Sequence, residues 1–206
     1  MDFTRPVQAV IPGAQGRILA VLTETTAELN LRTIAHLAGI SQAQASRVLP
    51  RLVALGLVER REVPPSSLFR LVPEHVAAGP VLALARVRST TMAEMGRIAA
   101  NLPISPLSAI VFGSFARGEA VAGSDIDTVL VRPAEIPDSD DRWATTVEEW
   151  STRVSRLTGN PVEVFETGPD EIAAQLAAGK GVWEDIHRDG IVVHGLRIDQ
   201  LLSADG

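Results

Sequence analysis

Two aspartates separated by a single residue are the feature of the sequence with the clearest chemical meaning. Asp125 and Asp127 begin an apolar run that ends at Val131. Successive side chains of a β-strand point to opposite faces, so both carboxylates are predicted to emerge on one face and Ile126 on the other. Paired carboxylates suit a hard divalent cation such as Mg²⁺. Either aspartate alone could equally be a turn residue at the start of a strand.

A glycine-serine pair, Gly113-Ser114, lies upstream of these aspartates, directly after the apolar, strand-like residues 107–112. Gly113 allows the backbone to approach a phosphate closely, and Ser114 with the amides that follow can bind phosphate oxygens at a helix N-terminus. Arg117 can neutralise the same phosphates, or it can belong with Glu119 to a solvated helix face. Together the two pairs predict a site for a metal ion and a triphosphate.

The spacing of Gly113-Ser114, ten residues and Asp125-Ile126-Asp127 resembles the signature of the nucleotidyltransferase superfamily that includes DNA polymerase β. The stretches GSFARGEA and GSDID are especially similar to the minimal nucleotidyltransferases. The resemblance covers residues 107–194 and implies a mixed sheet flanked by helices, with a third carboxylate on a later strand. Glu163 fits that position, because it alternates with its valine neighbours in PVEVFE, whereas Glu166 would face the other side.

The chemistry implied by this resemblance is nucleotide transfer. Two Mg²⁺ ions would be held by Asp125, Asp127 and Glu163, and ATP is the expected nucleoside triphosphate, bound at Gly113, Ser114 and Arg117. Glu163 would complete one metal site or take the proton of the acceptor hydroxyl. AMP would pass to that hydroxyl with release of pyrophosphate.

The acceptor is expected to be a macromolecule, because only 43 residues follow Glu163 and they indicate small elements that would not enclose a drug. Minimal nucleotidyltransferases commonly act as antitoxins that adenylylate a HEPN-type toxin, which makes a cognate toxin the implied protein partner. The sequence contains no tyrosine, so self-modification would require serine or threonine. Two other functions remain open: a regulator whose nucleotidyltransferase fold senses a nucleotide, and an antibiotic nucleotidyltransferase.

The first part of the chain has a different pattern. Helical periodicity over 16–24 and 32–38 is followed by a turn at Gly39, a third helix that begins at Gln42, and two strand-like segments at 57–63 and 68–72. Residues 16–72 resemble the winged helix-turn-helix domain of bacterial transcription regulators.

That resemblance implies contacts with double-stranded DNA. The residues expected in the major groove are Gln42, Gln44, Ser46 and Arg47, and those expected at phosphates on the wing are Arg60, Arg61 and Arg70. Pro50 departs from the pattern, because a proline inside the recognition helix removes a backbone hydrogen bond and can kink it. The domain could instead pack only against a partner or a second copy, so a homodimer is left open.

The fold class predicted for the chain is α+β in two domains. A winged helix-turn-helix domain (1–78), a connecting helix (79–102) and a nucleotidyltransferase domain (103–206) are expected. Residues 1–78 contain eight arginines and six acidic residues, and the remainder contains eleven basic and nineteen acidic residues. The absence of cysteine excludes disulfides, thiol nucleophiles and cysteine-bound zinc. It also fits a cytoplasmic protein, and no membrane span or secretion signal is predicted.

Overall fold

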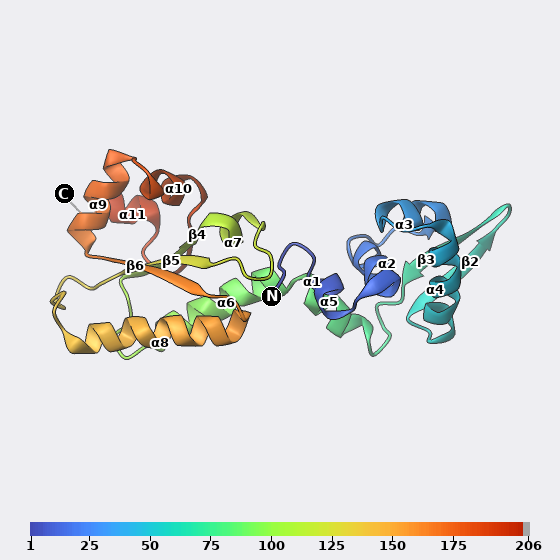
Figure 1. The fold of residues 1–206 in the computed structure, drawn as a ribbon, viewed down its shortest axis with the longest axis horizontal. Helices are drawn as coiled ribbons and strands as arrows, with labels where there is room; N and C mark the ends of the chain where they lie inside the picture. The colour runs from blue at the N-terminus through green and yellow to red at the C-terminus, as the bar shows by residue number, and fades with distance from the viewer. Residues whose placement is uncertain (204–206) are drawn as a thin grey trace. The chain divides into compact units, whose positions relative to one another are not determined.

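The computed structural model describes residues 1–203, which form two compact units. One unit comprises residues 5–87, and the other comprises residues 1–4 together with the chain from residue 88 onward. Figure 1 shows the helices and strands of both units. Within residues 1–203, no helix combines the length and the apolar character that crossing a membrane requires.

The unit formed by residues 5–87 contains five helices and a small antiparallel sheet with the strand order β1-β3-β2. Its elements are α1 (Pro6–Val10), α2 (Gly13–Thr23), β1 (Leu29–Asn30), α3 (Leu31–Leu37), α4 (Gln42–Ala54), β2 (Val58–Val63), β3 (Ser66–Leu71) and α5 (Ala78–Ala85). The helices pack on one core, whose fully buried side chains include Ile18, Ile34, Leu49 and Leu52.

Helix α4 begins where the sequence predicts. Gly39 takes a positive φ of 61° in the preceding turn, a conformation that glycine adopts without strain. Ser41 then caps the helix, since its hydroxyl accepts a hydrogen bond from the Gln44 amide at 3.1 Å. The helix continues past Pro50 without interruption, so the packing of Leu49 and Leu52 outweighs the hydrogen bond that proline removes.

The second unit is built on a four-stranded mixed sheet with the order β6-β5-β4-β7. Strand β4 is antiparallel to β5 and β7, whereas β5 and β6 are parallel. Its elements are α6 (Val87–Ala100), β4 (Ser108–Phe112), α7 (Gly113–Arg117), β5 (Ile126–Val131), α8 (Asp141–Thr158), β6 (Val162–Thr167), α9 (Pro169–Ala178), α10 (Val182–Asp189), β7 (Ile191–Gly195) and α11 (Ile198–Ser203). The predicted α+β class, with a mixed sheet flanked by helices, is confirmed.

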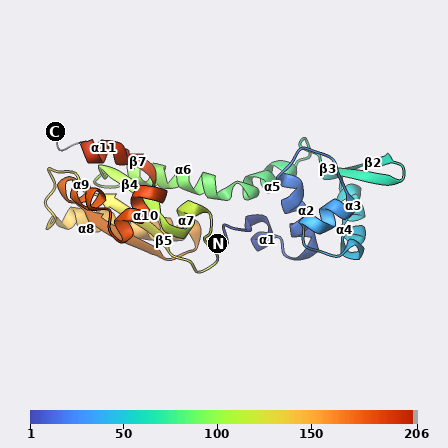
Figure 2. The same ribbon diagram turned by 90° about the horizontal axis from the view of Figure 1, so that it is seen from above.

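Helices cover both faces of this sheet. Helices α9, α10 and α11 lie over one face, and α6 and α8 lie along the other (Figures 1 and 2). The first face buries an apolar cluster made by Ile110, Phe112, Val129, Val131, Ile172, Leu176, Ile186 and Leu201. On the second face, the indole of Trp150 donates a hydrogen bond of 3.1 Å to the Thr128 hydroxyl. The alternation along β5 therefore sends Asp127 to the α9–α11 face and Thr128 to the α8 face.

The structure departs from the expected single connecting helix over residues 79–102. Two helices replace it, because the backbone at Arg86 leaves the helical conformation, with φ −100° and ψ 12°. Ala78 and Val81 of α5 are buried in the core of residues 5–87, whereas α6 belongs to the other unit almost entirely. Each helix therefore serves a different core, which explains the break. Three short elements, α1, β1 and α11, were also not predicted.

Replacing Thr128 by valine is predicted to destabilise the second unit. The Thr128 hydroxyl donates to the Glu163 carbonyl at 3.1 Å and accepts from the buried Trp150 indole. Valine keeps the shape but leaves the indole N–H without its acceptor, which should cost about 1–3 kcal/mol in the free energy of unfolding. The exposed Thr145→Val, on α8, should cost less than about 0.5 kcal/mol. Urea unfolding of the full chain measures both, and equal losses would contradict the prediction.

Candidate active site and nucleic-acid interface

Strand register brings the predicted carboxylates of β5 and β6 side by side. Asp127 pairs with Glu163 in the parallel ladder, and Phe112, at the end of β4, pairs with Asp127 in the antiparallel one. Residues paired across neighbouring strands present their side chains to the same face. Asp127 and Glu163 therefore share the α9–α11 face, with Asp127 half-buried and Glu163 exposed. Asp125 lies just before β5 and is exposed.

Gly113 is adapted to the carboxylate of Asp127. A Cβ atom at position 113 would lie 2.2 Å from the Asp127 Oδ2 atom, well inside contact distance. The backbone at Gly113 also has a φ of 66°, a value that side-chain-bearing residues rarely adopt. Only glycine satisfies both conditions, so the residue at position 113 and the carboxylate of Asp127 depend on each other. Ser114, which follows in α7, is half-buried.

The electrostatics at the end of the sheet where Asp127 lies, called the sheet edge below, favour a cation. Burial raises the pKa of the Asp127 carboxyl, and the negative charges of Glu163 and Asp125 raise it further, against a smaller opposing effect of Arg117. Three carboxylates near one another supply only oxygen ligands, which suits Mg²⁺. As these side chains are arranged within residues 1–203, no three His, Asp or Glu groups already form a cage for a metal. The exposed Asp125 and Glu163 would have to turn toward Asp127.

The guanidinium of Arg117 is already engaged in ion pairs and is therefore not available to a phosphate without a rearrangement. Its guanidinium pairs with Glu119 Oε2 at 2.8 Å and with Asp189 Oδ2 at 3.3 Å. Asp189, at the end of α10, also accepts from Arg188 at 2.9 Å, and that arginine is the main reason that the pKa of Asp189 is lowered. A role for Arg117 at phosphates therefore stays a prediction, and it would require an exchange of ion pairs.

Glu166 faces away from this edge, as the alternation along β6 predicts. Its carboxylate accepts a hydrogen bond of 3.0 Å from the indole of Trp143 on α8. It is therefore bound on the opposite face from Asp127, which leaves Glu163 as the carboxylate of β6 that shares the Asp127 face.

Sequence reasoning missed Asn160, which holds the loop in front of Asp125. The Asn160 side chain is 1% exposed, and its amide donates to the carbonyls of Val121 at 3.2 Å and Ser124 at 2.9 Å. The Ile126 amide, next along, donates to the Pro161 carbonyl at 2.9 Å. The only local signal for Asn160 was its place in a turn after a helix.

The recognition helix α4 presents two of the four predicted groove residues, Gln42 and Arg47, without other engagement, whereas the Ser46 hydroxyl donates to the Ala43 carbonyl at 3.0 Å. Gln42, Ser46 and Arg47 are exposed along it. Gln44 is exposed too, but its side chain closes the capping box by accepting from the Ser41 amide at 3.0 Å. Gln44 thus already serves the helix start.

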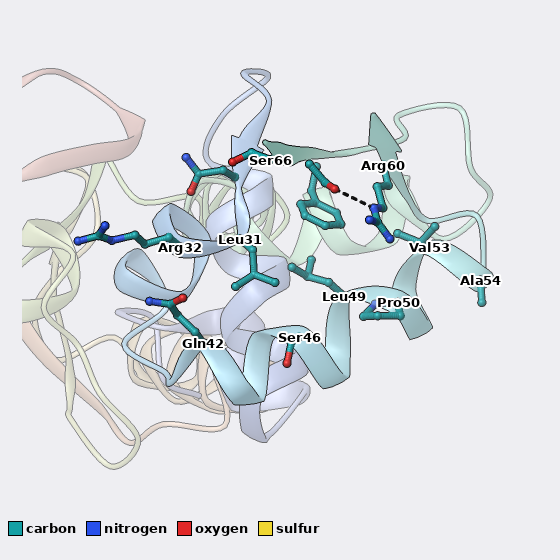
Figure 3. Close-up of a pocket in the computed structure, with 13 residues that line it drawn as sticks. Leu31, Arg32, Gln42, Ser46, Leu49, Pro50, Val53, Ala54, Arg60 and Ser66 are labelled. Atoms are coloured by element: carbon teal, nitrogen blue, oxygen red, sulfur yellow. Dashed lines mark hydrogen bonds between the residues drawn. The ribbon is translucent and has the colours of Figure 1, made fainter. Parts of the chain in front are cut away.

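A cavity of about 620 Å³ lies between α3, α4 and the wing formed by β2 and β3. Figure 3 shows Gln42 and Ser46 along one side, with Arg32 and Arg60 on other elements around it. Arg32, the second residue of α3, is exposed and was not predicted. Of the four residues predicted to contact the major groove, Gln42 and Ser46 line this cavity.

The wing arginines are all paired with acids. Arg60 contacts Glu62 at 2.7 Å, Arg61 donates to Glu28 at 2.9 Å, and Arg70 pairs with Glu59. The Arg61 guanidinium also lowers the pKa of Glu28. The phosphate contacts predicted for Arg60 and Arg61 would therefore compete with these pairs.

Comparison with known proteins identifies both parts of the chain. Residues 11–66 match the profile of the MarR family, and residues 97–172 match that of the nucleotidyltransferase domain. No curated protein matches the chain significantly.

Two solved structures resemble parts of the fold. One, described as the crystal structure of a toxin-antitoxin with AMP-PNP, is 17% identical over 56% of this chain and 84% of its own, with a TM-score of 0.35. The other, a MarR-family transcriptional regulator from Silicibacter pomeroyi, is 25% identical over 48% of this chain and 79% of its own, with a TM-score of 0.33.

The chain thus joins two known classes of domain. Its N-terminal part is a MarR-type winged helix domain, and its C-terminal part is a nucleotidyltransferase domain. Both resemblances predicted from the sequence are confirmed at this level.

Neutralising Asp127 is predicted to stabilise the ligand-free protein. The pKa of this carboxyl is raised in the folded state, so its ionised form is disfavoured by folding, and the cost is present at pH values above the folded pKa. Asp127→Asn should therefore unfold at a higher temperature than the wild type at pH 7. The difference should shrink as the pH falls toward 3.8, the ordinary value for aspartate, because the folded protein takes up the proton at a higher pH than the unfolded chain.

Thermal melts across this pH range provide the measurement. Glu135→Gln removes one charge from an exposed loop of the same unit and should leave no such pH-dependent gain. A stability gain for Asp127→Asn that is equal at pH 4 and pH 7 would contradict the electrostatic explanation.

Proposed function

We propose that the C-terminal unit transfers a nucleoside monophosphate, AMP from ATP, to a hydroxyl group of a macromolecular acceptor, and that the winged helix unit binds duplex DNA. The observation that carries the first part is the register of β4, β5 and β6, which sets Gly113, Asp127 and Glu163 along one edge. An antitoxin that modifies a cognate HEPN-type toxin and binds its own promoter is one form of this function.

Asp125, Asp127 and Glu163 would hold the divalent metal in this proposal. When bound, Mg²⁺ polarises phosphate oxygens and lowers the pKa of a nearby hydroxyl. The backbone at Gly113 permits close approach of the triphosphate, and the Ser114 hydroxyl donates to a phosphate oxygen. Alternatively, Glu163 takes the acceptor proton instead of completing the metal site, since it is exposed. A bond then forms between the acceptor oxygen and the α-phosphorus, and pyrophosphate leaves.

The acceptor is proposed to be macromolecular because the edge is open. Asp125 and Glu163 are both exposed to solvent, and hydrolysis of the triphosphate by water competes wherever water has free access. A protein docked on this edge would both present its hydroxyl and exclude water.

The aspartates are predicted to be indispensable for transfer. With ATP, magnesium and the product of the neighbouring gene, the wild type should add units of ~329 Da, the mass expected for AMP, to that partner. Asp125→Asn and Asp127→Asn should abolish the addition and weaken MgATP binding by at least about 100-fold, since each removes a direct metal ligand. Mass spectrometry and calorimetric titration measure the two effects.

Glu163 and Glu166 supply a matched pair for this experiment. Glu163→Gln should reduce transfer strongly, whereas Glu166→Gln, on the opposite face of the same strand, should not. Transfer that survives Asp127→Asn would disprove the site. Aspartate-dependent MgATP binding with no pyrophosphate release would instead favour a nucleotide-sensing regulator, and label found only on an added aminoglycoside would favour an antibiotic-modifying enzyme.

DNA binding is supported by the exposed polar face of α4. Arg47 is exposed there and makes no ion pair within residues 1–203, so its charge is available at no cost. Arg61, in contrast, must leave Glu28 before it can meet a phosphate. Glu28, which directly precedes β1, therefore lowers the sequence-independent part of the affinity.

Glu28→Gln is predicted to tighten binding to duplex DNA of any sequence. The change releases Arg61, and one added phosphate contact steepens the dependence of log affinity on log salt by about 0.9. Glu24→Gln, an exposed residue of the same unit, removes an equal charge without releasing an arginine and should give a smaller effect. Arg47→Ala should weaken binding to the preferred site. Anisotropy titrations at several salt concentrations measure these differences, and no binding by the wild type at low salt would leave only a protein-docking role.

A further inference from the structure

The chain passes between the two units at two points, after Thr4 and after Val87. Phe3 lies one residue before the first crossing, and Arg88 directly follows the second. Both contact α7, the five-residue helix that begins with Gly113-Ser114. Two segments separated by more than eighty positions in the sequence therefore converge on one short element.

Phe3 packs against the middle of α7. Its ring lies 4.7 Å from the ring of Phe115, centroid to centroid, at an angle of 76°, an edge-to-face arrangement that is favourable beyond the area it buries. Phe3 is 5% exposed, and Phe115 is fully buried. The Phe3 amide also donates to the Ala120 carbonyl at 2.9 Å, which ties the loop that leads from α7 toward Asp125.

Arg88 contacts the C-terminal half of α7. Its Nε atom donates to the Phe115 carbonyl at 2.9 Å, and its terminal nitrogen donates to the Ala116 carbonyl. The Phe115 carbonyl also accepts from the Gly118 amide at 3.1 Å, so the guanidinium fork adds a second donor there and supplies one to the Ala116 carbonyl. A lysine has no such fork and could not reproduce this arrangement.

We propose that Phe3 and Arg88 are positioning residues for the triphosphate-binding segment Gly113-Ser114. A helix of five residues is not stable on its own, so its orientation depends on the groups packed around it. Phe3 and Arg88 fix α7 from its side and its C-terminal end, and thereby hold Gly113-Ser114 ready for the phosphates. This inference rests on the proposed function of that segment.

MgATP titrations of the full chain by calorimetry test the proposal. Phe3→Ala and Arg88→Gln should each weaken MgATP binding by about tenfold, as loss of groups that orient a ligand-binding residue does elsewhere. Phe3→Leu, which retains most of the apolar bulk, should restore most of the affinity. Arg88→Lys should fall between the wild type and Arg88→Gln.

The controls match each variant in type. Phe69→Ala removes a phenylalanine with the same 5% exposure from the other unit, and Arg97→Gln removes an arginine from α6 that pairs only with Glu94 among the ion pairs of residues 1–203. Neither should change MgATP affinity. Thermal melts confirm that each variant is folded at the titration temperature, and Arg88→Gln provides the test if Phe3→Ala is not.

The outcomes separate the inference from the function on which it rests. If the wild type binds no MgATP, the proposed function is wrong and the inference fails with it. If the wild type binds MgATP and Phe3→Ala or Arg88→Gln binds it equally well, only the inference is overturned. Equal losses in the variants and in their controls would also overturn it, since they would indicate a general effect of destabilisation.

Discussion

The candidate active site depends on one steric constraint, which is that the Asp127 carboxylate occupies the space of the missing side chain at Gly113. A Cβ atom at position 113 would lie 2.2 Å from Asp127 Oδ2. The pairing of β4 with β5 imposes this contact, because it sets Phe112 opposite Asp127. The phosphate-binding and metal-binding parts of the proposed site are therefore not independent. A shift of one residue in the register would send Asp127 to the α8 face and separate them.

Charge is arranged in opposite ways in the two units. On the wing, each predicted DNA-contacting arginine has an acidic partner, so the charges are balanced before any ligand arrives. At the sheet edge, Asp127 has carboxylate neighbours, and the opposing effect of Arg117, a cation already paired with Glu119, is smaller. A group that is poorly stabilised in the free protein gains most from a ligand of opposite charge, which favours the sheet edge as the place where a cation binds.

Sequence patterns predicted the parts of this structure that depend on neighbouring residues. Period-two alternation placed Glu163 and Glu166 on opposite faces of one strand, and turn chemistry at Gly39 and Ser41 located the start of α4. Contacts between distant residues were not predictable in this way. Arg61 and Glu28 are 33 positions apart, and the break at Arg86 arises because α5 and α6 serve different cores. Such features depend on tertiary packing, for which local patterns contain no signal.

The shortness of α7 explains why its surroundings matter. Nucleating a helical turn is unfavourable, and a helix of five residues recovers little of that cost through its own hydrogen bonds. Its conformation must then come from its surroundings, which include Phe3, Arg88, the end of β4 and Asp189 of α10. Phe3 and Arg88 are 85 positions apart in the sequence, so the contacts that orient α7 come from two distant segments of the chain. The orientation of the segment that we propose to bind the triphosphate therefore depends on tertiary contacts rather than on hydrogen bonds within its own helix.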